Sequence, residues 1–171
     1  MALKYHNPYG LEKGDSGMSS TDSATGSDAF WWQGSLMTIK ARAADTGGAL
    51  GLVEGSFYEG FGPPLHVHHR EDEGLYVLEG EIRFRQGDDE FVASPGRLVW
   101  CPRDVPHAFK VQPGGARALV IVSPGGFERM FEEGGVPVRE SAEPPVEEYD
   151  PDAAIALAER FGFEVVGPQL A

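Results

Sequence analysis

Short apolar segments recur at regular spacing between about residues 30 and 125, and they constrain the fold more than any other feature. Glycine, proline and aspartate separate each segment from the next. Many short segments with this punctuation are typical of the strands of a β-sandwich or barrel. We therefore expect an all-β fold with strands at Leu36–Ala41, Leu50–Tyr58, Leu75–Arg85, Glu90–Ala93, Arg97–Cys101, His107–Val111 and Arg117–Val122.

The segment Leu75–Arg85 has the clearest alternation. Successive side chains of a strand point to opposite faces. One face is therefore apolar and the other charged: Tyr76, Leu78, Gly80, Ile82 and Phe84 against Glu79, Glu81, Arg83 and Arg85. Glu73, however, has the parity of Leu75 and Val77. Either both faces are buried at this point, or a bulge near Gly74 exchanges them. We expect the first arrangement, because Leu75–Leu78 is apolar throughout.

The segments on either side of the strands have a different character. Residues 1–29 are poor in large apolar side chains, which favours a partly flexible N-terminal extension. After residue 125 the apolar residues take a helical period, first in a short turn that ends at Gly134 and then in a helix from Pro151 to about Phe161. Ile155, Leu157 and Phe161 form the expected packing face of this helix. The chain is thus expected to be one domain, with a barrel at 30–125 and a C-terminal helical extension packed on it at 126–171.

Charge and cysteine content exclude several classes of function. The chain has 27 acidic and 14 basic residues and a formal net charge of −13. Such a surface repels phosphate backbones and anionic lipids, so we expect no nucleic-acid or membrane partner. No run of about 18 apolar residues and no secretory signal is visible, so a cytoplasmic location is expected. Cys101 is the only cysteine, which excludes an intrachain disulfide and a cysteine-based zinc cluster.

Four of the five histidines lie within the strand-rich region. His66 and His68 are two residues apart, so they share one face of a strand, whereas His69 points to the opposite face. Two imidazoles on the same side of a strand can bind one metal ion. Glu73 can turn back as an oxygen ligand, and a hairpin-built sheet can bring His107 alongside. Any metal ion would therefore have nitrogen and oxygen ligands.

These residues resemble the first motif of the cupin family. The motif is matched by Gly60, five residues, His66-Val67-His68, four residues, Glu73, six residues and Gly80. The second cupin motif is matched by Gly96, five residues, Pro102-Arg103-Asp104, two residues and His107. Asp104 stands where the family usually has glycine, and Val111 where it usually has asparagine. Asp104 lies at a turn and Val111 at a strand end, so neither departure is at a ligand.

The resemblance implies a double-stranded β-helix, or jelly-roll barrel, with short C-terminal helices added. It also implies one metal ion held by His66, His68, Glu73 and His107. Three imidazoles and a carboxylate suit a divalent transition metal ion, whether Fe, Mn, Ni, Co, Cu or Zn. Phe109 shares the face of His107, and we expect it to line a substrate pocket together with Leu75.

Two segments, Pro63–Glu73 and Pro102–His107, are similar to the quercetinase-like (flavonol dioxygenase) group of cupins. This similarity implies a mononuclear dioxygenase that acts with dioxygen on an enolic or hydroxylated aromatic small molecule, with Glu73 as the catalytic base. Two alternatives stay open: a non-oxidative metal-dependent isomerase, cyclase or lyase, and a non-catalytic cupin that binds a small molecule. A homodimer is also expected, because cupins commonly pair through barrel edges.

Overall fold

A computed structural model describes residues 28–138, 144 and 151–171 of the chain. Almost all of the predicted N-terminal extension, residues 1–27, lies outside the described residues. The helices are α1 (Arg129–Gly134) and α2 (Pro151–Phe161). The strands are β1 (Ala29–Trp32), β2 (Ser35–Ala41), β3 (Gly51–Phe57), β4 (His66–His68), β5 (Asp72–Gln86), β6 (Asp89–Ala93), β7 (Leu98–Cys101), β8 (His107–Ser123), β9 (Val136–Pro137) and β10 (Phe163–Val165).

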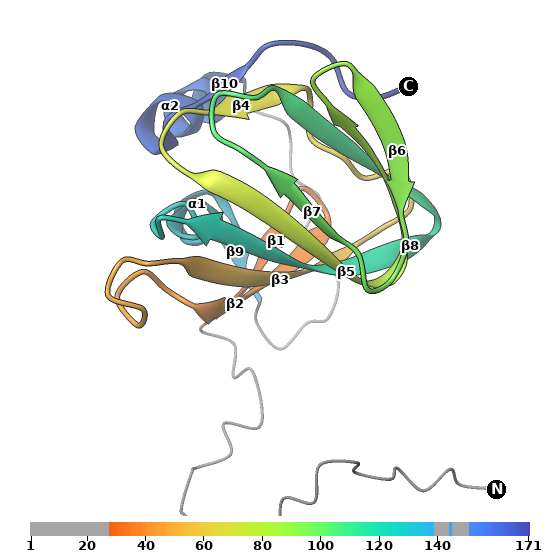
Figure 1. Cartoon of the computed structure of the whole chain (residues 1–171). Helices are drawn as coiled ribbons and strands as arrows, with labels where there is room; N and C mark the ends of the chain where they lie inside the picture. The colour runs from red at the N-terminus through yellow and green to blue at the C-terminus, as the bar shows by residue number, and fades with distance from the viewer. Residues whose placement is uncertain (1–27, 139–143, 145–150) are drawn as a thin grey trace, which may run out of the picture.

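The strands form a two-layered antiparallel barrel (Figure 1). One layer has the order β6-β5-β8-β4-β10, and the other has the order β7-β5-β8-β3-β2-β1-β9. The long strands β5 and β8 belong to both layers: residues 82–86 of β5 pair with 107–111 of β8 in the first, and residues 72–80 pair with 116–123 in the second. The all-β jelly-roll architecture expected from the sequence is confirmed. The two segments predicted at His107–Val111 and Arg117–Val122 are parts of the single strand β8.

Strand β5 exchanges its inward face where it passes from one layer to the other. Glu73, Leu75 and Val77 are buried, whereas Tyr76 is 37% exposed; after the crossing, Ile82 and Phe84 are the buried residues. The pairing of β5 with β8 shifts register at two places, between Val77 and Glu79 and between Gly80 and Ile82. The expectation that both faces of Leu75–Leu78 are buried is therefore wrong. A change of parity does occur, but not near Gly74. It lies at residues 78–81, because the strand leaves its first layer there.

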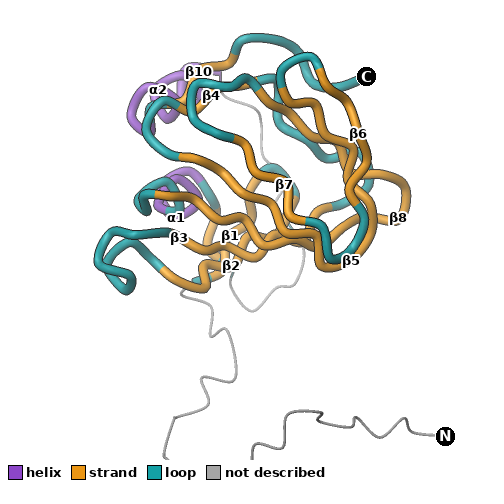
Figure 2. Tube along the Cα trace, viewed as in Figure 1, coloured by secondary structure: helices purple, strands orange, loops and turns teal. Residues whose placement is uncertain are grey.

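The helices lie together beside one end of the barrel (Figure 2). In α1 and the turn before it, Phe127, Met130 and Phe131 are buried in the core. In α2, Phe161 is buried and Leu157 packs against the core, but Ile155 is 58% exposed. Ile155 is thus not part of the packing face that the sequence suggested.

Glu128, which precedes α1, is a fully buried carboxylate. Its two oxygens accept the backbone N–H groups of Ala43 (2.7 Å) and Gly126 (2.6 Å). Buried charges persist when hydrogen bonds satisfy them. Gly51 leaves the space for this carboxylate, since a Cβ atom there would lie 2.1 Å from Oε2. Glu128 therefore joins the start of α1 to the loop after β2.

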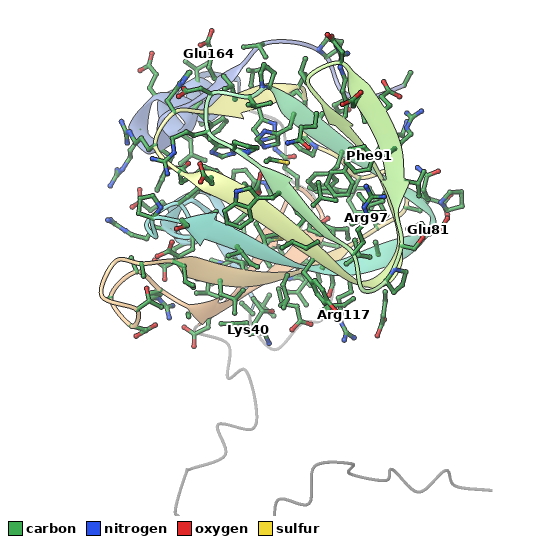
Figure 3. The ribbon with its side chains drawn as sticks, in the orientation of Figure 1. Lys40, Glu81, Phe91, Arg97, Arg117 and Glu164 are labelled. Carbon is green, nitrogen blue, oxygen red and sulfur yellow. The ribbon has the colours of Figure 1, made fainter. Side chains whose placement is uncertain are left out.

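Charged side chains cover the outside of the barrel (Figure 3). Arg117 on β8 bridges two strands, with Nε 3.3 Å from Glu54 on β3 and Nη1 3.0 Å from Glu79 on β5. Arg97 lies over the ring of Phe91, 4.5 Å from its centroid. These contacts are exposed or half-exposed, so each contributes little to stability compared with the buried core.

Gly80 provides a test of the crossing in β5. Its φ is +75°, and a Cβ atom would lie 2.1 Å from the backbone oxygen of Gly115. Gly87 also has a positive φ, +59°, but has no atom within 4 Å of that position. The left-handed conformation costs a non-glycine residue roughly 1–2 kcal/mol. We expect Gly87→Ala to lose about this much free energy of unfolding in urea and Gly80→Ala clearly more. If both variants lose the same free energy of unfolding, the close approach of Gly80 to the backbone oxygen of Gly115 does not contribute.

Candidate metal centre

Three strands bring the four sequence-predicted ligand residues together. His66 and His68 come from β4, Glu73 from the start of β5 and His107 from the start of β8. His66 is the direct antiparallel partner of His107. All four side chains are buried, and one potential ligand atom from each lies within 4.8 Å of the others. His66 and His68, which parity places on the same face of their strand, therefore both point into the barrel.

Hydrogen bonds fix the orientation of each imidazole. His66 Nδ1 lies 2.8 Å from the carbonyl oxygen of Pro64, and His107 Nδ1 lies 3.0 Å from that of Val105. A carbonyl oxygen can only accept, so Nδ1 donates in both rings. Nε2 of neutral His66 keeps its lone pair, whereas Nε2 of His107 donates to the carboxylate of Glu73 at 2.9 Å. His68 Nδ1 instead donates to the carboxylate of Glu71, at 2.7 Å. All three histidines therefore direct Nε2 at the cluster.

His68 Nε2 shows that the cluster fits a metal ion. It is fully buried and has no hydrogen-bond partner within the described part of the chain, and the oxygen of Glu73 is 3.7 Å away. A buried polar atom without a partner costs about 1–3 kcal/mol. A cation among the four ligand atoms would supply the missing partner. The donor set, three imidazole nitrogens and one carboxylate oxygen, is compatible with a divalent transition metal ion.

The charges inside the cluster favour the cation-binding forms of Glu73 and His66, whereas without a metal ion His107 is held toward its protonated form. Burial alone would raise the pKa of Glu73, but the hydrogen bond with His107 and the nearby imidazoles lower it to about 2. Burial, with the neighbouring His107, lowers the pKa of His66 to about 4. Burial also opposes the charged form of His107, but its 2.9 Å hydrogen bond to Glu73 outweighs this and raises its pKa. Glu73 is thus ionised and His66 neutral near pH 7, as metal ligands must be.

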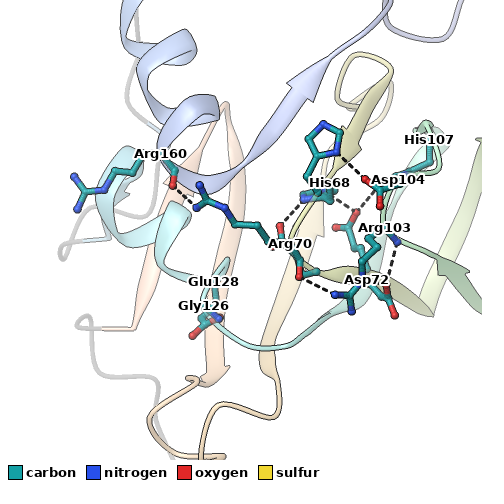
Figure 4. A network of polar contacts seen from close by, with 12 residues as sticks. His68, Arg70, Asp72, Arg103, Asp104, His107, Gly126, Glu128 and Arg160 are labelled. Carbon is teal, nitrogen blue, oxygen red and sulfur yellow. Dashed lines mark hydrogen bonds and ion pairs between the residues drawn. The ribbon is translucent and has the colours of Figure 1, made fainter.

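A network of polar contacts surrounds the cluster (Figure 4). His69 points away from the cluster, as its parity predicted, and its Nδ1 lies 2.8 Å from the carboxylate of Asp104. Asp104 has a φ of +63°, which explains why the family motif usually has glycine there. Asp72 accepts two hydrogen bonds from Arg103, at 3.0 and 2.9 Å. These contacts hold the β4–β5 loop against the β7–β8 loop.

An apolar cavity of about 770 Å³ opens onto His66, His68 and Glu73. Phe109 lines it, whereas Leu75 is fully buried in the core and is not among its lining residues. No lysine or arginine occurs among the described residues that line it. Its aromatic wall consists of Trp32, Phe57, Phe61, Phe109, Phe127, Phe131 and Phe163.

Two contributors to the site were not predicted from the sequence. The first is Glu71, whose position three residues after His68 was a usable signal. The second is the C-terminal segment: α2 contributes Ile155 to the cavity wall and β10 contributes Phe163. The ring centroid of Phe163 lies 6.0 Å from that of His68, because β10 pairs with β4. Three-residue strands such as β4 and β10 have too little alternation to be read from sequence.

Cys101 pairs with Glu73 across β5 and β7 and is buried. Burial raises the pKa of its thiol far above the usual range, and the charge of Glu73 adds to the effect. Because the thiolate is the nucleophile, we expect no reaction of folded protein with an aromatic disulfide reagent at about pH 8. One thiol per chain should react after unfolding in guanidinium. Rapid reaction of the folded protein would contradict this burial.

Neither helix is long and apolar enough, within the part of the chain that the structure describes, to cross a membrane. Among curated proteins, quercetin 2,3-dioxygenase of Bacillus subtilis (strain 168) is 26% identical over 110 residues. The match covers 64% of this chain but only 33% of that protein, so the chain spans about a third of this relative's length.

Two solved structures are similar to the barrel. KdgF from Halomonas sp. gives a TM-score of 0.50 at 22% identity and covers 54% of this chain and 81% of that one. Recombinant pro-11S globulin of pumpkin gives a TM-score of 0.50 at 13% identity and covers 58% of this chain and 28% of that one. At these identities the likeness is one of fold. Residues 56–123, which run from β3 to the end of β8 and include all four clustered side chains, match the cupin domain family. This part of the chain is therefore a cupin domain.

Proposed function

We propose that His66, His68, Glu73 and His107 bind one divalent transition metal ion, and that the protein is a mononuclear dioxygenase for an enolic or hydroxylated aromatic compound. The observation that carries the proposal is the cavity, whose aromatic wall ends at the buried His/Glu cluster. A flat aromatic molecule could stack along this wall with one hydroxyl group directed at the cluster.

The charge of the cavity supports a substrate without negative groups. Glu159 and Glu164 are among its lining residues, and none of the described lining residues is a lysine or arginine. Phosphates and carboxylates are normally recognised by such cations. A sugar would also need many polar partners, because each unpaired buried hydroxyl is costly. Both arguments favour a hydroxylated aromatic compound over a sugar acid or sugar phosphate.

Glu73 is the proposed catalytic base. It is buried, lines the cavity and carries an ionised carboxylate near pH 7. A bound divalent ion would withdraw electron density from a substrate oxygen and, if redox active, allow electron transfer to dioxygen. In our proposal Glu73 accepts the hydroxyl proton of the substrate while the apolar wall excludes water. The curated relative's name, quercetin 2,3-dioxygenase, supports flavonols as the first substrates to test.

The central test is oxygen uptake with a flavonol by protein loaded with iron, cobalt, nickel or manganese. We expect uptake with at least one metal and its loss in His68→Ala, because a ligand is removed. His69→Ala is the matched control: the neighbouring imidazole is half exposed and points away, so uptake should persist. If none of the four loaded forms takes up oxygen over a broad panel of enols and phenols, the dioxygenase proposal fails.

Ile155 tests whether the cavity is the substrate site. It is exposed yet lines the cavity mouth, so Ile155→Glu should change the free energy of unfolding by less than about 0.5 kcal/mol. We expect KM for a flavonol to rise roughly five- to tenfold, equivalent to about 1–1.4 kcal/mol of lost contact. Val92→Glu places the same charge at an exposed apolar position outside the cavity and should leave KM unchanged. If the unaltered protein, Ile155→Glu and Val92→Glu all have the same KM, the substrate binds outside this cavity.

A further inference from the structure

We propose that Glu71 is a positioning residue that orients His68 and strengthens it as a metal ligand, and that it makes His68 the most strongly bound of the three imidazoles. This inference rests on the proposed metal site, but not on the dioxygenase reaction. Glu71 lies outside the motif residues that identify the cluster, and it comes from the loop between β4 and β5.

The three imidazoles differ in the group that accepts their Nδ1 proton. For His66 and His107 the acceptor is a neutral backbone carbonyl two residues earlier in the chain. For His68 it is the side chain of Glu71, and the 2.7 Å distance is the shortest of the three. A hydrogen bond to a carboxylate is roughly twice as strong as one between neutral groups. It also makes the opposite nitrogen a better electron donor, as carboxylate–histidine–metal arrangements show.

Hydrogen bonds hold the backbone just before Glu71 in place. The side chain is 5% exposed. Before it, the carbonyl oxygen of His68 accepts the N–H of Asp104 at 2.8 Å, and the N–H of His69 donates to Gly162. Next to it, Arg103 donates to the carbonyl oxygen of Arg70 at 3.2 Å. The carboxylate therefore meets His68 without a large loss of conformational freedom.

Positive groups stand on the outer side of Glu71. It lines a small surface pocket together with Arg70, Arg129 and Arg160. Arg70 reaches across this pocket to the carbonyl oxygen of Arg160, at 2.7 Å (Figure 4). Arg129 and Arg160 also form ion pairs with Glu133 in the same pocket, each at 2.9 Å, so only part of their charge offsets the cost of the buried Glu71 carboxylate. The arrangement thus runs inward from arginines to Glu71, from Glu71 to His68, and from His68 Nε2 to the cluster.

Packing leaves His68 little freedom apart from this bond. Phe127 meets the imidazole edge to face, with ring centroids 4.5 Å apart and planes at 78°. The ring is almost completely buried, and its Nε2 has no hydrogen-bond partner among the residues that the structure describes. Rotation of the ring would bury both nitrogens without partners. Glu71 and Phe127 therefore fix the plane of the imidazole, and Glu71 alone fixes its tautomer.

Two variants separate the charge of Glu71 from its hydrogen bond. Glu71→Gln keeps an oxygen that can accept from Nδ1 but removes the charge, whereas Glu71→Ala removes both. We expect the dissociation constant for zinc, measured by competition with a chromophoric chelator, to rise about 10- to 100-fold in Glu71→Ala and by a smaller factor in Glu71→Gln. The visible absorption bands of the cobalt-loaded protein should shift in both variants, which a purely structural role would not produce.

Asp104→Asn is the matched control. Asp104 makes the same kind of bond, 2.8 Å to an Nδ1 atom, but its partner His69 points away from the cluster. Asparagine also tolerates the left-handed conformation at that position. Zinc affinity and the cobalt spectrum should therefore match those of the unaltered protein. Thermal denaturation without metal shows whether Glu71→Ala is folded; if it is not, Glu71→Gln decides the outcome.

The outcomes separate this inference from the proposed function. If the unaltered protein binds zinc and cobalt, and Glu71→Gln has the same affinity and the same spectrum, Glu71 has no such role and the proposed function stands. If the unaltered protein binds neither ion, the proposed metal site fails and this inference fails with it. Weaker binding and shifted bands in the Glu71 variants, with Asp104→Asn unchanged, support the inference.

Discussion

The pairing of β5 with β8 is the constraint on which the rest of the structure depends. Each strand belongs to both layers of the barrel, and the two run in opposite directions. Glu73, at the start of β5, pairs with Val122 in one layer, while His107, at the start of β8, pairs with Gln86 in the other. The two residues consequently face each other across the interior, and the 2.9 Å bond between them joins the layers. The site is therefore a consequence of how the barrel closes.

Placing three histidines and a carboxylate in this interior is costly. Groups of this kind lose their hydration when buried, and hydrogen bonds return only part of it. The cluster recovers some of the cost through Pro64, Val105 and Glu71, each of which satisfies one Nδ1 atom. The cost at His68 Nε2 is not recovered, since none of the described residues forms a hydrogen bond with this atom. A natural protein retains such an unsatisfied group where it has a function, which agrees with the proposed metal ion.

The chain's net charge and its cavity lead to the same expectation about ligands. The formal charge is −13, and the described lining of the cavity contains acids but no lysine or arginine. The arginines near the site lie instead on the far side of Glu71, in the surface pocket. Positive charge thus supports the inner carboxylate from outside, while the cavity itself remains suited to uncharged aromatic molecules.

The sequence by itself determined the all-β class, most strand positions and the four clustered side chains. Alternation with a period of two identified the His66 and His68 pair and turned His69 outward, and motif spacing supplied Glu73 and His107. The sequence could not locate the exchange of faces in β5, because this exchange depends on where the strand leaves one layer for the other. Leu75 was expected in the cavity and lies in the core, because parity predicts the face of a strand but not which inward residues line a cavity. Only the tertiary structure decided that Glu71 meets His68, and that α2 and β10 complete the cavity wall. Contacts between segments this far apart depend on how the layers pack, and local periodicity carries no information about them.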